Sequence, residues 1–186
     1  FTVEEVETKP FKRNPAPPFT TSTLQQEASR KLGFNTQRTM RTAQGLYEGI
    51  DTGDGSVGLI TYMRTDSVTL SSESLEDIRN LISARYGANN LPESPRIYTT
   101  KAKNAQEAHE GIRPTSAART PENMKSYLSE DQFKLYSLIW KRTIASQMIP
   151  AIFDTVALDL VPDRQPDVGR LRANGQTLID PGFIAV

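Results

Sequence analysis

The sequence predicts an α+β fold, in which a mainly helical domain over residues 22–146 is inserted into a partial β-rich domain made of residues 1–21 and 147–186. Three observations predict it. Residues 1–9 alternate apolar and polar side chains weakly and predict an exposed strand, and the segment that begins at Ala151 alternates as well and predicts strands. Between them, apolar residues recur three and four positions apart, which is the spacing of helices that bury one face. Residues 10–18 carry four prolines and favour a stiff extended connector between the two bodies.

The composition allows one sizeable core or two small ones. Of 186 residues, 37% are hydrophobic and 24% are charged, and the absence of cysteine excludes disulfides and thiolate metal sites. No apolar run approaches the roughly 20 residues of a membrane helix. Because the chain starts at Phe1 and stops within an apolar run, we expect it to be an internal fragment of a longer protein.

The charges cancel overall, with 22 basic and 22 acidic residues, which argues mildly against a nucleic-acid binder. Locally they do not cancel. Residues 28–47 contain basic side chains and no acid, and residues 96–106 contain Arg96, Lys101 and Lys103 and no acid. Two such strips on a neutral body can follow a nucleic-acid backbone.

Residues 22–50 predict two helices joined by a short turn. Thr23 and Gln26 form a capping box for the first helix, and Gly33 ends it. The predicted inner faces consist of Leu24, Ala28 and Leu32 in the first helix and of Met40, Ala43, Tyr47 and Ile50 in the second.

The second of these helices is expected over residues 36–49. Two helices joined by a short glycine-containing turn are a helix-turn-helix candidate. Arg38 and Arg41 would lie on the outer part of the second helix, as candidate DNA contacts. Two core helices with solvated arginines explain the same pattern and remain the alternative.

Four further elements follow in order. Residues 57–60 predict a short buried strand, and residues 71–86 predict a helix that is capped by serine and ended by Gly87. A second long helix is expected over residues 130–148, where apolar residues repeat along one face. Residues 147–186 return to strands.

The segment with the clearest chemical character is GLITYMRTDS, residues 58–67. A strand that ends in a polar loop is a common place for a functional site, because the strand holds the loop rigidly. Tyr62 and Arg64 are two residues apart, so in extended backbone both side chains point to the same side. A phenol beside a guanidinium suits attack on a phosphodiester, because arginine matches two phosphate oxygens and its charge favours the phenolate. The alternative is a tyrosine that caps a core and an arginine in a surface ion pair.

The second candidate segment, NAQEAHEGIRP over residues 104–114, contains the single histidine, His109, between Glu107 and Glu110. It lacks the spacing of a zinc site, and no second histidine exists. A lone histidine between acids is often structural, which is the alternative to a functional role. Arg113 is a second plausible phosphate contact.

Four segments of this chain resemble the bacterial topoisomerase I branch of the type IA DNA topoisomerases. They are PPFTTSTLQQEASRKLGFNTQRTMRTAQGLYEG, GLITYMRTDS, AQEAHEGIRPT and QFKLYSLIWKRTIASQM. Met63 follows the tyrosine as in that branch, and Gly111 stands where the family more often has alanine. The resemblance implies a helical domain with a CAP-like helix-turn-helix that acts as a moving gate.

The resemblance also implies the chemistry. Tyr62 attacks a DNA phosphate and becomes linked to the new 5′ end, Arg64 contacts that phosphate, and His109 takes part in phosphate handling. The implied catalytic residues are therefore Tyr62, Arg64 and His109, and the candidate DNA contacts are Thr61, Arg64, Arg113, Arg38 and Arg41. One strand is cut, another passes through the gap, and the cut is religated without ATP, so that negative supercoils relax.

The same resemblance sets expectations for cofactor, partners and place. Mg²⁺ is expected in the parent enzyme, held by an acidic Toprim domain outside this chain, and no cofactor is expected in the fragment, which should be inactive alone. The expected partners are single-stranded segments of negatively supercoiled DNA and the remaining domains of the same polypeptide, in the cytoplasm at the nucleoid. The alternatives are a winged-helix-like DNA-binding module without catalysis and an inert structural fragment.

Overall fold

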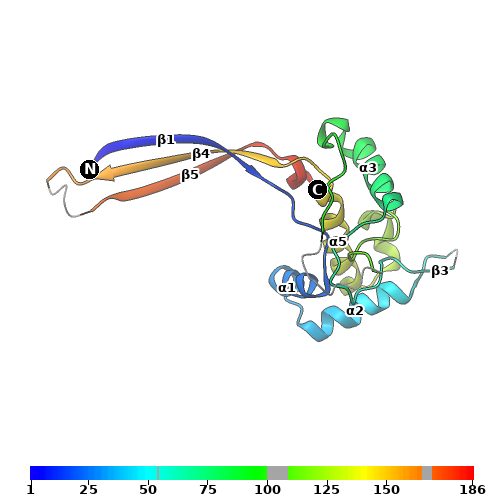
Figure 1. Ribbon diagram of the computed structural model, residues 1–186. Coiled ribbons are helices and arrows are strands. Elements are labelled where there is room, and N and C mark those ends of the chain that lie inside the picture. The colour runs from blue at the N-terminus through cyan, green and yellow to red at the C-terminus, as the bar shows by residue number, and fades with distance from the viewer. Residues whose placement is uncertain (54, 100–108, 165–168) are drawn as a thin grey trace. The chain divides into compact units, whose positions relative to one another are not determined.

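The computed structural model describes residues 1–53, 55–99, 109–164 and 169–186. It contains helices and antiparallel sheets, which confirms the α+β class (Figure 1). The chain divides into two compact units, one of residues 1–15 and 149–185 and the other of residues 16–148 and 186. The predicted division into residues 1–21, 22–146 and 147–186 stays a prediction.

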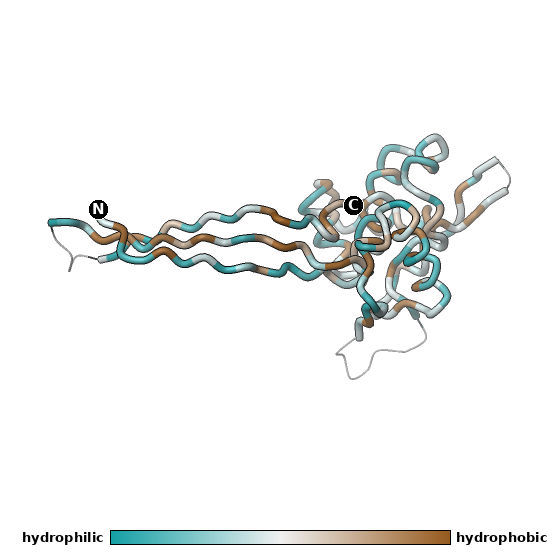
Figure 2. The backbone as a smooth tube through the Cα atoms, turned by 90° about the horizontal axis from the view of Figure 1, so that it is seen from above, coloured by the Kyte–Doolittle hydropathy of each residue, from teal (hydrophilic) through white to brown (hydrophobic). Residues whose placement is uncertain are grey.

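The first unit is a three-stranded antiparallel sheet with strand order β1-β4-β5. Its strands are β1 (Thr2–Arg13), β4 (Ala151–Val161) and β5 (Leu171–Asp180), followed by the short helix η4 (Gly182–Ala185). Polar and apolar residues alternate along the strands (Figure 2). The central strand β4 pairs along both edges, with Phe153 opposite Phe11 of β1 and Leu178 of β5, and the register shifts once in each pairing, between Val3 and Glu5 and between Ile152 and Phe153.

The expected connector over residues 10–18 was wrong in its first part, because β1 continues through Pro10 to Arg13. Proline removes a backbone donor, which an inner strand cannot tolerate but an edge strand can. Since β1 lies at the edge of the sheet and pairs only with β4, Pro10 fits there.

The second unit consists of helices around α5. Its elements are α1 (Thr21–Leu32), α2 (Thr36–Glu48), β2 (Ile50–Asp51), β3 (Ser56–Val57), α3 (Ser72–Tyr86), η1 (Ala88–Asn90), α4 (Pro121–Met124), η2 (Lys125–Tyr127) and α5 (Glu130–Ser146). The central helix, α5, packs against α1, α2 and α4. Its buried Trp140 and Tyr136 donate hydrogen bonds of 2.9 and 2.6 Å to the carbonyls of Ala117 and Arg119. Of the helices in the described residues, none is long and apolar enough to cross a bilayer.

The start of α1 differs from the prediction. Its N-cap is Thr20, and the capping box joins Thr20 to Thr23, so the predicted box of Thr23 and Gln26 was wrong. Thr20 has extended backbone and accepts the Thr23 N–H, which satisfies one of the unpaired donors at the helix start. The predicted end is confirmed, because Gly33 takes the left-handed conformation at φ 68°.

The buried face of α2 is Thr39, Ala43 and Leu46, so only Ala43 of the predicted helical face is confirmed as buried within the helix. Thr39 can be buried because its hydroxyl donates to the Asn35 carbonyl at 2.9 Å. Tyr47 was predicted to be part of the core but is 41% exposed. The predicted ends of the two later helices agree better: α3 is capped by Ser71 and ends at Gly87, whereas α5 ends two residues before 148.

Candidate active site

The predicted strand over residues 57–60 is shorter than expected. Only Ser56–Val57 pairs with a strand, β2, while Ile60 forms an isolated bridge with Pro114. Leu59 donates its N–H to the Leu46 carbonyl at 2.8 Å, so its backbone bonds to the end of α2 instead of to a sheet. Leu59 and Ile60 are nonetheless buried, and they anchor the start of the segment that follows.

That segment, residues 61–67, is named here the tyrosine loop. Its exposure alternates from residue to residue, although the chain bends at residues 63 and 64. Tyr62, Arg64 and Asp66 are exposed, whereas Met63, Thr65 and Ser67 are buried. The alternation is that of an extended segment with one face against the protein, so Tyr62 and Arg64 share the solvent-facing set.

The start of α1 holds the tyrosine loop from one side. The Thr21 hydroxyl donates to the Met63 carbonyl at 2.7 Å and accepts the Thr65 N–H at 2.9 Å. The Thr21 N–H donates to the Thr65 carbonyl, also at 2.9 Å. Thr21 therefore bonds to the backbone on both sides of Arg64, although it lies more than 40 residues earlier in the sequence.

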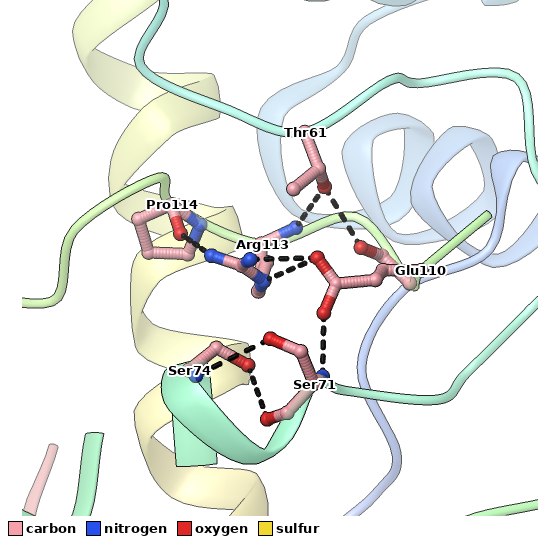
Figure 3. Close-up of polar contacts among 7 residues, drawn as sticks. Thr61, Ser71, Ser74, Glu110, Arg113 and Pro114 are labelled. Carbon is pink, nitrogen blue, oxygen red and sulfur yellow. Dashed lines mark hydrogen bonds and ion pairs between the residues drawn. The ribbon is translucent and has the colours of Figure 1, made fainter. Parts of the chain in front are cut away.

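A second segment, residues 109–115, runs beside the tyrosine loop and is named here the histidine loop. One backbone bond joins the two loops, from the Thr61 N–H to the Arg113 carbonyl at 2.9 Å, and a second, from the Gly111 N–H to the Thr69 carbonyl at 2.9 Å, joins the histidine loop to the residues just after the tyrosine loop. The Thr61 hydroxyl adds two bonds, donating to the Gly111 carbonyl and accepting the Arg113 N–H (Figure 3).

This pairing brings His109 to Tyr62. Their ring centroids are 5.5 Å apart with an interplanar angle of 45°. Tyr47, from the end of α2, meets Tyr62 edge-on, with centroids 5.4 Å apart and an angle of 64°. Tyr62 is itself 37% exposed, so its phenol is accessible while its ring is held between two others.

Tyr47 is the site residue that sequence reasoning missed, since it was assigned to the core. The signal was present: a stripe that starts at Thr39 and continues through Ala43 and Leu46 leaves Tyr47 beside the core face. It was overlooked because threonine was not counted as a residue that α2 could bury.

Gly58 lies where the backbone before the tyrosine loop passes the end of α2. A Cβ at this position would be 2.7 Å from the Tyr47 carbonyl oxygen, which real Cβ atoms essentially never approach so closely. Only glycine allows this close approach.

We expect Gly58→Ala to lower the free energy of unfolding by about 1–3 kcal/mol, because backbone must shift to admit the methyl group. Chemical denaturation of the chain measures it. Gly175→Ala is the matched control, since a Cβ there meets nothing within 4 Å and the φ angle is not strained. Equal free energies of unfolding for Gly58→Ala and Gly175→Ala would show that the fold does not require glycine at position 58.

Glu110 and Arg113 form an ion pair inside the histidine loop (Figure 3). One carboxylate oxygen of Glu110 accepts from the Arg113 Nε at 3.1 Å and Nη2 at 2.6 Å, and the other accepts the Ser71 N–H. Arg113 Nη1 donates to the Pro114 carbonyl. Burial by itself raises the pKa of Glu110, but the bonds from Arg113 and Ser71 favour the carboxylate more, so the pKa lies below its usual value.

The lowered pKa has a consequence for stability. A carboxyl group whose pKa is lower in the folded chain stabilises the fold above its unfolded pKa, and this contribution is lost as the pH falls through the folded pKa. We therefore expect the difference in unfolding free energy between the wild-type chain and Glu110→Gln to shrink between about pH 7 and about pH 3. Urea titrations at both pH values measure it, with Glu76→Gln on α3 as the control. If the difference in unfolding free energy stays constant between these two pH values, the pKa of Glu110 is not lowered by folding.

The predicted arginine contacts differ in their surroundings. Arg64 is exposed, and within the part of the chain that the structure describes no carboxylate pairs with it. Arg38 forms two bonds of 2.7 Å with the Asp131 carboxylate and lies over the Phe34 ring. Arg38 and Arg41 line a polar surface hollow between the starts of α2 and α5.

The site therefore brings together Thr61, Tyr62, His109 and Arg113, whereas Arg38 lies about 13 Å along α2 from Tyr47. Lys101, Lys103 and Glu107 lie outside the described residues. Among those described, no group of three or more histidine, aspartate and glutamate side chains could hold a metal ion.

Comparison with known proteins defines the class. A family model described as DNA topoisomerase matches residues 1–186, and the chain belongs to that family, which confirms the resemblance seen in the sequence. It is 59% identical over 185 residues to "DNA topoisomerase 1" of Xylella fastidiosa (strain Temecula1), covering 99% of this chain and 22% of that protein. It is 54% identical over 186 residues to "DNA topoisomerase 1" of Rickettsia felis, covering 100% of this chain and 24% of that protein.

A solved structure is similar as well. The full-length topoisomerase I from Thermotoga maritima matches with a TM-score of 0.85 and 42% identity, over 99% of this chain and 29% of that chain. The chain thus spans between about a fifth and a quarter of the length of these curated relatives.

Proposed function

We propose that this chain is the tyrosine-bearing part of an ATP-independent type IA DNA topoisomerase, an isomerase that cuts one DNA strand, passes another through the gap and rejoins the first. The observation that carries the proposal is the accessible Tyr62 phenol, whose ring is held between Tyr47 and His109 in a chain of the DNA topoisomerase family. Its substrates are single-stranded segments of negatively supercoiled DNA, in the cytoplasm at the nucleoid.

In the proposed reaction, the Tyr62 oxygen attacks the phosphorus of a DNA phosphodiester. A bond forms between the tyrosine oxygen and phosphorus, the bond to the 3′ oxygen breaks, and the proton lost by the phenol is matched by one gained at the 3′ hydroxyl. One phosphodiester is exchanged for another, so the reverse reaction religates the strand without ATP.

Arg64 and His109 support this exchange. Arg64 shares the exposed face of the tyrosine loop and has no described carboxylate partner, so its guanidinium is available to two phosphate oxygens. His109, at ring contact with Tyr62, is placed to hydrogen-bond the phosphate or an associated proton path. We propose that Thr61 contacts the same phosphate and that Arg41 contacts the strand farther along α2. The guanidinium groups of Arg113 and Arg38 are engaged by Glu110 and Asp131.

We also propose that Mg²⁺ supports the longer enzyme, with ligands outside this chain, where it would stabilise phosphate charge. The 186 residues alone would then carry the nucleophile without its electrostatic partners, and would not relax plasmids.

The α1–α2 pair is proposed to be a CAP-like helix-turn-helix used as part of a moving gate. The bidentate Arg38–Asp131 contact, with each bond at 2.7 Å, supports this use over groove reading, because it ties the outer face of α2 to α5. A winged-helix-like DNA-binding module without catalysis would need that face free.

The test uses the longer enzyme with a radiolabelled single-stranded oligonucleotide. A denaturing gel should show a protein–DNA adduct linked through the new 5′ end, and mass spectrometry of the digested adduct should place the nucleotide on Tyr62. Plasmid relaxation is measured in parallel. An adduct on a different residue, or relaxation without any adduct, would overturn the proposal.

For His109→Gln we expect slower cleavage with a measurable residual rate, because glutamine keeps hydrogen-bonding capacity but cannot exchange a proton. The loss should be about ten- to a hundredfold, at or below the lower limit of the range for a positioned proton-transfer group, because glutamine keeps part of the interaction. Single-turnover cleavage of the oligonucleotide measures it. A wild-type rate would return His109 to a structural role.

A further inference from the structure

The Glu110 carboxylate connects the histidine loop to the start of α3. Resting on the proposed function, we propose that Glu110 and Arg113 are positioning residues: they hold the histidine loop so that His109 stays against Tyr62. The basis is the juxtaposition of an ion pair that starts at the residue next to His109 with a second bond from the same carboxylate to Ser71, which follows the tyrosine loop in the sequence.

The first step in the argument is what Glu110 joins. One of its oxygens accepts two bonds from the Arg113 guanidinium within the histidine loop. The other accepts the N–H of Ser71, the residue that caps α3 (Figure 3). Since Ser71 follows the tyrosine loop in sequence, this side chain fixes the distance between the end of that loop and the backbone that carries His109.

The second step is how the other end is held. The Thr61 hydroxyl donates to the Gly111 carbonyl at 2.8 Å and accepts the Arg113 N–H at 3.0 Å. Thr61 directly precedes Tyr62, so the residues next to both members of the Tyr62–His109 contact belong to one bonded network. Gly111 is itself closely packed, because a Cβ there would be 3.1 Å from Pro18.

The third step separates this role from phosphate binding. The Arg113 side chain is only 15% exposed, and Nε, Nη1 and Nη2 all donate to acceptors within the protein. A guanidinium engaged in this way does not offer a free fork to a phosphate. Arg113 therefore acts through its partners, in contrast to the exposed Arg64.

The experiment uses the longer enzyme with Glu110→Ala and Glu110→Gln. We expect Glu110→Ala to slow single-turnover cleavage roughly ten- to a hundredfold, because small displacements of a positioned group have effects of this size. Affinity for single-stranded DNA should stay within about twofold of the wild type. Glu110→Gln should recover part of the rate, since its amide oxygen still accepts the Ser71 N–H. Glu76→Gln, at an exposed glutamate of α3, is the matched control.

The decisive readout is the combination with His109→Gln. If Glu110 acts by placing His109, its replacement should slow cleavage little further once His109 is absent. Three results would each overturn the proposal. They are rate losses that multiply when the two replacements are combined, a cleavage rate in Glu110→Ala equal to that of the control, and a wild-type rate in His109→Gln.

Folding is monitored by thermal unfolding. If Glu110→Ala does not fold, the rate of Glu110→Gln decides, and failure of that variant to fold would replace the positioning role with a structural one. Tyr62→Phe is run alongside. Adducts that persist in Tyr62→Phe would refute the proposed function itself, whereas multiplicative effects with adducts that still require Tyr62 would refute only this inference.

Discussion

Tyr62→Phe is expected to abolish the covalent protein–DNA adduct of the longer enzyme while leaving its affinity for single-stranded DNA within about twofold. Phenylalanine keeps the ring that contacts Tyr47 and His109 and removes only the oxygen that would attack phosphorus. Phenylalanine has no nucleophilic atom at this position, and the reaction needs a nucleophile that is held rigidly within reach of the phosphate. Plasmid relaxation should be lost together with the adduct.

The measurement pairs a denaturing gel for the adduct with a binding titration under the same salt conditions, because phosphate contacts make affinity dependent on salt. Tyr127→Phe is the matched control, since Tyr127 is 47% exposed and lies in η2, in another part of the helical unit. Loss of adduct together with loss of DNA binding would point to a structural Tyr62. Adduct formation at the control rate would exclude Tyr62 as the nucleophile.

Arg64→Ala is expected to slow both cleavage and religation more than it weakens DNA binding. Removal of one charge-stabilising donor from a phosphate transition state should raise the barrier by about 2–4 kcal/mol. Arg64→Lys should recover only part of this loss, because an ammonium group is a point charge and cannot form two parallel bonds to phosphate oxygens. The exposure of Arg64 makes a large effect on folding unexpected.

Single-turnover cleavage and religation rates with saturating oligonucleotide measure the effect of Arg64→Ala. Arg164→Ala, an exposed arginine in the sheet unit, controls for the loss of one positive charge. A rate equal to that of the control would remove Arg64 from the site. A loss confined to binding would make it a DNA contact without a role in the chemistry.

Local signals in the sequence determined the class of fold and most of the helix ends. Ser71 caps α3 and Gly33 ends α1 because the groups that satisfy a helix terminus lie within a few residues of it. The tyrosine loop was found for the same reason: a polar segment after a buried run is visible in a window of ten residues. Family membership also followed from contiguous segments.

The strand prediction failed because partners elsewhere in the chain decided the outcome. The predicted strand over residues 57–60 was cut short because Leu59 bonds to the end of α2 and Ile60 to Pro114. These partners are not marked in residues 57–60 themselves. The core face of α2 was misassigned for a local reason, because the Thr39 hydroxyl donates to the Asn35 carbonyl four residues earlier and Thr39 can therefore be buried.

The sequence by itself determined which side chains are available for chemistry: a tyrosine and an arginine on one loop, and a histidine on another. Only the tertiary structure decided that His109 lies against Tyr62, that Tyr47 completes the ring contact, and that Arg113 is engaged by Glu110. The physical reason is that local hydrogen bonds and apolar periodicity act over a few residues, whereas contacts between loops depend on how buried elements pack. That packing satisfies the backbone N–H groups of Thr61, Thr21 and Ser71 with acceptors about 40 to 50 residues away.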